Sequence, residues 1–123
     1  MISYMFKSGR AVRVYLEEIL DSINDIQSYT KGVTKAAFFA DKKTQDAVIR
    51  KIEVIGEIVK RLPPVITKQD PQIPWRDIAG MRDILIHEYA TVDLHETWVV
   101  VKIDISKLKR SVKKIVKQID EKE

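Results

Sequence analysis

The stretch Asp41–Pro64, DKKTQDAVIRKIEVIGEIVKRLPP, decides the fold of this chain. Its apolar residues recur every three or four positions, which places them on one face of an α-helix. They are Val48, Ile52, Ile55, Val59 and Leu62. Asp41 stands where a side-chain oxygen can cap the first turn, and Pro63 and Pro64 end the helix because proline cannot continue its hydrogen bonding. The stretch therefore predicts a long amphipathic helix with one face in a core.

The same periodicity continues on both sides of this helix. The expected elements are a helix over about 10–29, a short turn over 36–40, the helix just described, a fourth helix from Pro74 toward Tyr89, and a fifth stretch from about Leu94 to Ile119 with a kink near Asp104 or Ser106. Gly32 is a plausible stop for the first helix, and Thr34 and Asp93 are suited to cap the elements that follow them. The run Val99–Val101 favours a strand by propensity, but its position between helical patterns favours a helix.

These elements together predict an all-α fold. Residues 10–123 are expected to form one antiparallel, up-and-down bundle of four to five helices, and residues 1–9 a flexible N-terminal extension. Trp75 and Trp98 are expected to anchor the core. Gly80, inside a helical pattern, suggests a close approach of two helices.

Composition narrows the functional classes. The chain of 123 residues has no cysteine, which excludes a disulfide framework, a thiol nucleophile and cysteine-ligated metal. No apolar run approaches the roughly 18 residues that span a bilayer, and the start lacks the pattern of a secretory signal, so a cytoplasmic protein without a membrane anchor is expected. The net charge of +4 permits a polyanionic partner without requiring one.

The segment that carries chemistry is Pro74–Trp98, PWRDIAGMRDILIHEYATVDLHETW. Asp83 and His87 are four positions apart, so on one helix the carboxylate can orient the imidazole. Arg82 and His87 are five apart, about 140° around an ideal helix, and cannot meet on one phosphate from a straight helix. Either the helix loosens near Ile86 or two chains build a composite site; a composite site along a dimer cleft is favoured.

The residue types suit RNA cleavage without a metal. A histidine with a pKa near ~6.5 can activate a 2′-hydroxyl at neutral pH, and the planar cation of an arginine can stabilise the phosphorane. From spacing alone an ordinary structural interpretation is still favoured, in which Arg82 pairs with Asp77 or Asp83 and His87 is half-buried at a helix end.

The run from Arg82 through His87 to Tyr89 resembles the R-x-x-x-x-H-x-Y signature of the HepT-like branch of the HEPN superfamily. Its flanks are similar as well: residues 73–81 and 92–94 with Trp98 around the motif, and residues 41–48 and 52–57 upstream. The resemblance covers about residues 12–119, nearly the whole domain.

The resemblance implies a function. HEPN domains of this kind dimerise through their motif helices, and many are metal-independent endoribonuclease toxins paired with a minimal nucleotidyltransferase (MNT) antitoxin. Carried across, Arg82 and His87 are the catalytic pair, Asp83 orients, and Tyr89 binds phosphate and is AMPylated by the antitoxin. Products ending in 2′,3′-cyclic phosphate are expected, with neither cofactor nor metal. The alternative is a non-catalytic RNA- or nucleotide-binding subunit of the nucleotidyltransferase.

Two further features have a functional and an ordinary interpretation. Lys109, Lys113, Lys114 and Lys117 lie opposite the last apolar stripe and are candidate RNA-guiding residues, although an exposed solubilising face is favoured. His95 lies beside acidic residues, where a metal site is conceivable, but a solvated histidine is favoured.

Overall fold

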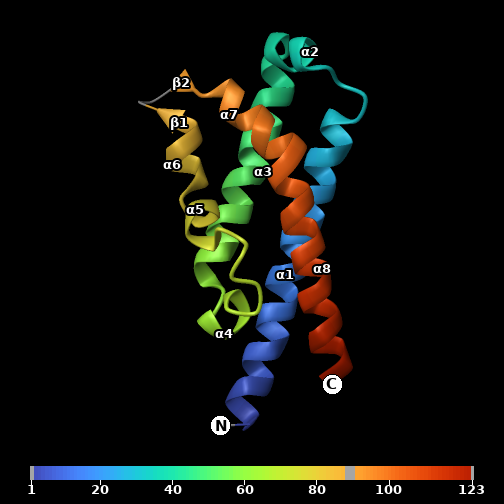
Figure 1. Cartoon of the computed structure of the whole chain (residues 1–123), viewed down its shortest axis with the longest axis vertical. Helices are drawn as coiled ribbons and strands as arrows, with labels where there is room; N and C mark the ends of the chain where they lie inside the picture. The colour runs from blue at the N-terminus through green and yellow to red at the C-terminus, as the bar shows by residue number, and fades with distance from the viewer. Residues whose placement is uncertain (1, 88–90, 123) are drawn as a thin grey trace.

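The computed structural model describes residues 2–87 and 91–122 and arranges most of them in an elongated helical bundle (Figure 1). Its elements are α1 (Ile2–Thr30), α2 (Lys35–Ala40), α3 (Lys42–Arg61), α4 (Pro64–Thr67), α5 (Trp75–Ala79), α6 (Met81–Leu85), β1 (Ile86–His87), β2 (Thr91–Val92), α7 (Leu94–Val99), the π-helix η1 (Val100–Asp104) and α8 (Ile105–Lys122). The direction alternates from α1 to α3, to α5–α6 and to the run α7–η1–α8 (Figure 1). The expected all-α, up-and-down bundle is confirmed.

Helix α3 lies at the centre of the bundle, between α1 on one side and α5 and α6 on the other. Its predicted apolar stripe is buried, from Val48 at the start to Leu62 just beyond the end. The stripe of α1 is buried as well, and α8 closes the core against α1. Each large apolar side chain removed from water contributes about 1.5–3 kcal/mol, so the amphipathic stripes hold the bundle together.

Local capping sets where these helices begin and end. The Thr34 hydroxyl accepts a hydrogen bond from the N–H three residues on at 3.1 Å, and the Asp93 carboxylate does the same at 3.0 Å. The Asp41 carboxylate accepts from the Thr44 hydroxyl at 2.7 Å and from its N–H at 3.1 Å, which lowers the pKa of Asp41. Gly32 follows α1 with φ of 72°, a left-handed conformation that suits glycine. These predicted caps and the predicted stop are confirmed.

The first helix is longer than expected. It begins at Ile2 rather than near Arg10, so residues 2–9 continue its backbone. The helical start predicted near Arg10 is therefore wrong, because no proline interrupts the segment and Gly9 costs a helix only about 1 kcal/mol. The division of the chain into an N-terminal extension of residues 1–9 and a domain of residues 10–123 stays a prediction.

The second half of the chain also differs in detail from the expected elements. The connector after Pro63 contains the short helix α4. The valine run is helical as predicted, since Val100 and Val101 face the core. Where a kink was expected near Asp104, the backbone widens into the π-helix η1 and returns to α-helix at Ile105.

Candidate functional site

Strands β1 and β2 lie at one end of the bundle, next to the start of α7 and at the same end as α2 (Figure 1). Helix α6 ends at Leu85, and the chain then pairs with itself in a two-residue antiparallel ladder, Ile86 with Val92 and His87 with Thr91. The N–H of Asp93 donates to the carbonyl of Leu85 at 2.7 Å, next to this ladder. The single helix expected from Pro74 to Tyr89 is therefore wrong in two places: it is interrupted at Gly80, between α5 and α6, and it has ended before Ile86. The part of this prediction that falls on residues 88–89 lies outside the described residues.

Ending the helix at Leu85 changes the geometry of the motif. Arg82 belongs to α6 and His87 to β1, so the helix does loosen at Ile86, the first of the two routes left open by their spacing. Asp83 is exposed on α6, and the shared helix face on which its orienting role depended is absent, because His87 is not helical. The structure describes only the backbone of Arg82 and His87, and Tyr89 lies outside the described residues.

Four buried side chains anchor α5 and α6 against the bundle. They are Trp75, Ile78, Met81 and Leu85, the last only 1% exposed. The indole N–H of Trp75 also donates to the carbonyl of Asp70 at 2.9 Å, which ties the connector to α5. The backbone that carries Arg82 thus rests on a packed face, and Trp75 anchors the core as predicted.

Glycine allows this close packing, but at a different position from the one expected. A Cβ on Gly56 of α3 would lie 3.1 Å from the carbonyl oxygen of Ile78 and 3.3 Å from that of Ala79. Gly80 separates α5 from α6, and a Cβ there would meet nothing closer than the Arg76 carbonyl at 3.7 Å. The close helix approach predicted for Gly80 is therefore wrong and belongs to Gly56.

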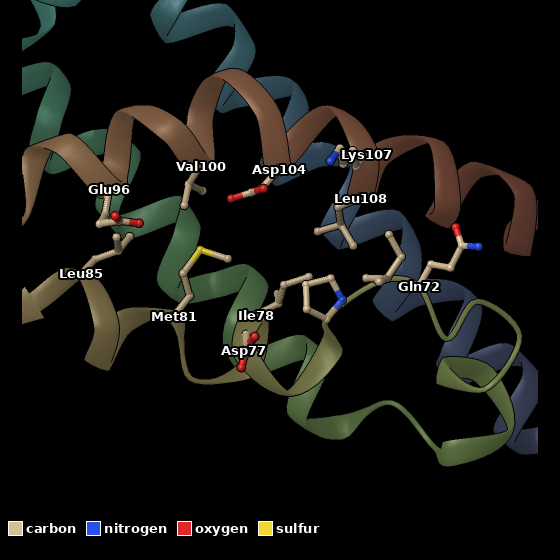
Figure 2. Close-up of a pocket in the computed structure, with 12 residues that line it drawn as sticks. Gln72, Asp77, Ile78, Met81, Leu85, Glu96, Val100, Asp104, Lys107 and Leu108 are labelled. Carbon is tan, nitrogen blue, oxygen red and sulfur yellow. The ribbon is translucent and has the colours of Figure 1, made fainter.

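A cavity of about 410 Å³ flanks the motif helix, between α5–α6 and the run α7–η1–α8 (Figure 2). Its floor is apolar, with Met81 and Leu85 on one side and Val100 on the other (Figure 2). The ionised groups among its lining residues are Asp77, Glu96, Asp104 and Lys107. Three carboxylates against one ammonium repel a phosphodiester, so this cavity is a poor candidate for the RNA-cleaving site.

The candidate RNA-guiding lysines divide into two groups. Lys113, Lys114 and Lys117 are exposed on α8, whereas Lys109 is half-buried and donates to the amide oxygen of Gln27 at 2.9 Å. Lys109 therefore helps to hold α8 on α1. The exposed lysines follow Leu94 by about 20 residues of helix, which at 1.5 Å per residue puts them roughly 30 Å from the motif end.

Aromatic residues of α2 and α7 meet beside the motif, which reading along the chain did not predict. Phe38 and Phe39 of α2 contact Trp98 and His95 of α7, respectively. The adjacent pair of phenylalanines was the available signal, but their partners lie more than fifty positions away. His95 is exposed, and the described residues hold no group of three potential metal ligands.

Comparison with known proteins decides the family. The family model described as "Ribonuclease HepT-like" matches residues 19–115. The chain belongs to the HepT-like ribonuclease family. The match includes the segment Arg82–Tyr89, together with helix α3 and most of α8.

Relatives of this HepT-like chain come from archaea and bacteria. It is 44% identical over 108 residues to the "Probable ribonuclease HepT" of Thermococcus cleftensis, covering 88% of this chain and 98% of that protein. It is 41% identical over 113 residues to a "Putative RNase" of Methanocaldococcus jannaschii, covering 92% and 97%. A third relative, "Gamma-glutamylcyclotransferase and putative RNase" of the same archaeon, is 51% identical over 109 residues, 89% of this chain but 49% of the relative. The chain thus spans about half of that third protein.

No solved structure matches the chain significantly. Within the parts of the chain that the structure describes, no helix is both long and apolar enough to cross a bilayer.

Proposed function

We propose that this HepT-like chain is a metal-independent endoribonuclease that acts as a homodimer. The observation that carries the proposal is membership of the HepT-like family together with the intact run from Arg82 to Tyr89 at one end of the bundle. Because α6 ends between Arg82 and His87, the two residues are carried by different backbone segments. Pairing two copies at this end would bring the arginine of one chain toward the histidine of the other.

The proposed reaction is an intramolecular transesterification of the RNA backbone. The neutral His87 imidazole takes the proton of a 2′-hydroxyl, and the 2′-oxygen attacks the adjacent phosphorus. Arg82 stabilises the negative charge that develops on the phosphorane oxygens. The 5′-oxygen leaves with a proton, which an imidazolium can donate, and the other product ends in a 2′,3′-cyclic phosphate. Asp83 is still proposed to orient the His87 imidazole, but the support for this role is the resemblance to the family signature and no longer the helical spacing.

Regulation is proposed to act on the motif tyrosine. A nucleotidyltransferase antitoxin of the MNT type would transfer AMP from ATP to the Tyr89 hydroxyl and release pyrophosphate. The added phosphodiester carries negative charge and bulk into the cleft, so RNA would be excluded by repulsion and by volume. In this proposal the chain is the toxin of a cytoplasmic toxin–antitoxin pair.

The exposed lysines of α8 are proposed to guide longer RNA toward the site. Lys113, Lys114 and Lys117 form this face, and at roughly 30 Å from the motif they would contact RNA well outside the cleaved bond. Neutralising Lys113 and Lys114 should flatten the salt dependence of binding to long RNA, and an unchanged slope would remove this role.

The test of the proposed function is RNA cleavage by purified protein in the presence of a chelator. Arg82→Ala and His87→Ala are each expected to slow cleavage by about 10²–10⁴-fold, because each removes a group that acts in the transition state. Arg61→Ala, which removes an exposed arginine at the end of α3, is the matched control and should cut at the wild-type rate. Wild-type rates in both motif variants would contradict the proposal and favour a non-catalytic RNA- or nucleotide-binding subunit.

A further inference from the structure

An aromatic and cationic shelf lies beside the motif end, where α2 and α7 meet. Its members are Lys35 and Phe39 of α2, His95 and Trp98 of α7, and Lys102 of η1. The rings of Phe39 and His95 meet edge to face, with centroids 5.8 Å apart and planes at 79°. The Lys35 ammonium lies 5.6 Å from the centroid of the Phe39 ring, and the Lys102 ammonium 4.7 Å from that of Trp98.

The aromatic rings of this shelf are partly open to solvent. Phe39 is 37% exposed, His95 is exposed and Trp98 is half-buried. Phe38 lies beneath them, fully buried, with its ring centroid 5.2 Å from that of Trp98. The exposed rings are therefore held in place by a packed aromatic residue.

We propose that this shelf stacks unpaired bases of single-stranded RNA next to the cleavage site. The proposal rests on the proposed function in taking RNA as the substrate and adds to it a base-binding subsite. Flat aromatic faces beside exposed ammonium groups are what a single strand needs, since each base presents a π-face and each linkage a negative charge. On base binding, the flexible lysines leave the ring faces and contact the flanking phosphates.

The place of the shelf in the fold supports an RNA occupant. Helix α7 begins directly after β2, whose Thr91 pairs with His87. His95 lies four residues beyond Thr91 in the chain, so the shelf adjoins the motif, whereas the lysine face of α8 is roughly 30 Å away. The two ammonium groups of the shelf lie over its aromatic rings, Lys35 over Phe39 and Lys102 over Trp98. Both lysines are exposed, so their ammonium groups can contact the phosphates of a strand bound on the shelf.

Binding of a fluorescein-labelled 2′-O-methyl oligouridylate of about twelve nucleotides tests the shelf, because a 2′-O-methyl group blocks cleavage. Phe39→Leu should weaken binding about 5- to 150-fold, the loss expected for one stacked base, with an unchanged salt slope. An abasic oligomer with the same number of phosphates should bind the variant and the wild type alike. Phe39→Trp should retain affinity for the oligouridylate.

Matched variants separate stacking from charge. Lys35→Gln should lower the salt slope by about 0.7, the value for one phosphate contact of a single strand. Tyr29→Leu removes an aromatic ring of similar exposure, 39%, from the end of α1, and Lys68→Gln removes an exposed lysine beyond α4; both should bind as wild type. If circular dichroism shows that Phe39→Leu is unfolded, the test rests on the salt slope of Lys35→Gln, and an unchanged slope would then contradict the shelf. Lys35 is exposed, so its replacement leaves the core intact.

Three results would overturn the shelf. The first is wild-type affinity in Phe39→Leu, and the second is an equal loss for the oligouridylate and the abasic oligomer. The third is a Phe39→Leu variant that still binds RNA but no longer binds a co-expressed nucleotidyltransferase, which would make the shelf a protein interface. Failure of the proposed function would give a different result. A chain that binds the oligouridylate through Phe39 but does not cut unmodified RNA would support the shelf and contradict the proposed nuclease activity.

Discussion

Within the motif, Tyr89 differs from Arg82 and His87 in the chemistry that each residue is proposed to perform. Arginine and histidine act on the scissile phosphate, whereas the tyrosine contributes one hydroxyl that can bind phosphate or accept AMP. A neutral hydrogen bond contributes about 0.5–1.5 kcal/mol, far less than a general base contributes to the rate. Removing the hydroxyl alone can therefore separate regulation from catalysis.

We expect Tyr89→Phe to cleave RNA within about tenfold of the wild-type rate while escaping AMPylation. The phenyl ring keeps the size of the side chain but offers no oxygen to receive AMP. Intact-mass measurement after co-expression with an MNT-type nucleotidyltransferase should show whole AMP units on the wild type and none on the variant. AMP units on Tyr89→Phe would place the modification at another residue.

Among the secondary-structure elements, the contact of α3 with α5 depends on a missing side chain. Gly56 lets the Ile78 and Ala79 carbonyl oxygens approach α3 to a distance at which a Cβ would be compressed. These oxygens belong to the backbone of a short helix whose Trp75 and Ile78 are buried, so α5 has little room to withdraw. Any shift would be passed along α5 and α6 to the backbone of Arg82.

We expect Gly56→Ala to destabilise the fold by about 1 kcal/mol, although alanine is the better helix former. The gain in helix propensity is about 1 kcal/mol, and overpacking against a backbone that cannot relax costs about 1–3 kcal/mol. The free energy of urea-induced unfolding measures the difference. Gly80→Ala is the control and should change stability by less than about 0.5 kcal/mol, since its Cβ meets only ordinary contacts. Stabilisation by Gly56→Ala would show that α5 moves freely.

For the whole molecule, the question is whether one chain or two complete the active site. An arginine in α6 and a histidine in β1 are separated by the helix end, which leaves both arrangements sterically open within the described backbone. In the proposed homodimer, a twofold axis would create two equivalent sites, each with the arginine of one chain opposite the histidine of the other.

We expect a mixture of Arg82→Ala and His87→Ala chains to regain RNA cleavage, although each is inactive alone. A heterodimer of the two variants contains one composite site with both residues intact. With random pairing, half of the dimers are mixed and carry one of two sites, so the mixture should recover about a quarter of the wild-type rate. Co-expression followed by a cleavage assay measures it. Persistent inactivity in mixtures shown to contain heterodimers would place both residues of a site in one chain.

Helical periodicity and capping were predictable because they depend on neighbouring residues alone. The stripe from Val48 to Leu62 and the caps at Thr34, Asp41 and Asp93 all occur where the amino-acid pattern placed them. The residue types of the motif were equally visible, because they lie within eight positions. Their spatial relation was not, since it was derived from an ideal helix that the chain abandons at Leu85.

The sequence by itself determined a helical bundle and its capped ends, because these follow from apolar periods of three to four residues and from single capping side chains. Only the tertiary structure decided that α6 stops at Leu85, that Gly56 carries the tight helix contact, and that Phe39 meets His95. Each of these depends on pairing or packing between segments distant in the chain. Such contacts outweigh local preference once the core has formed, and reading along the chain does not reveal them.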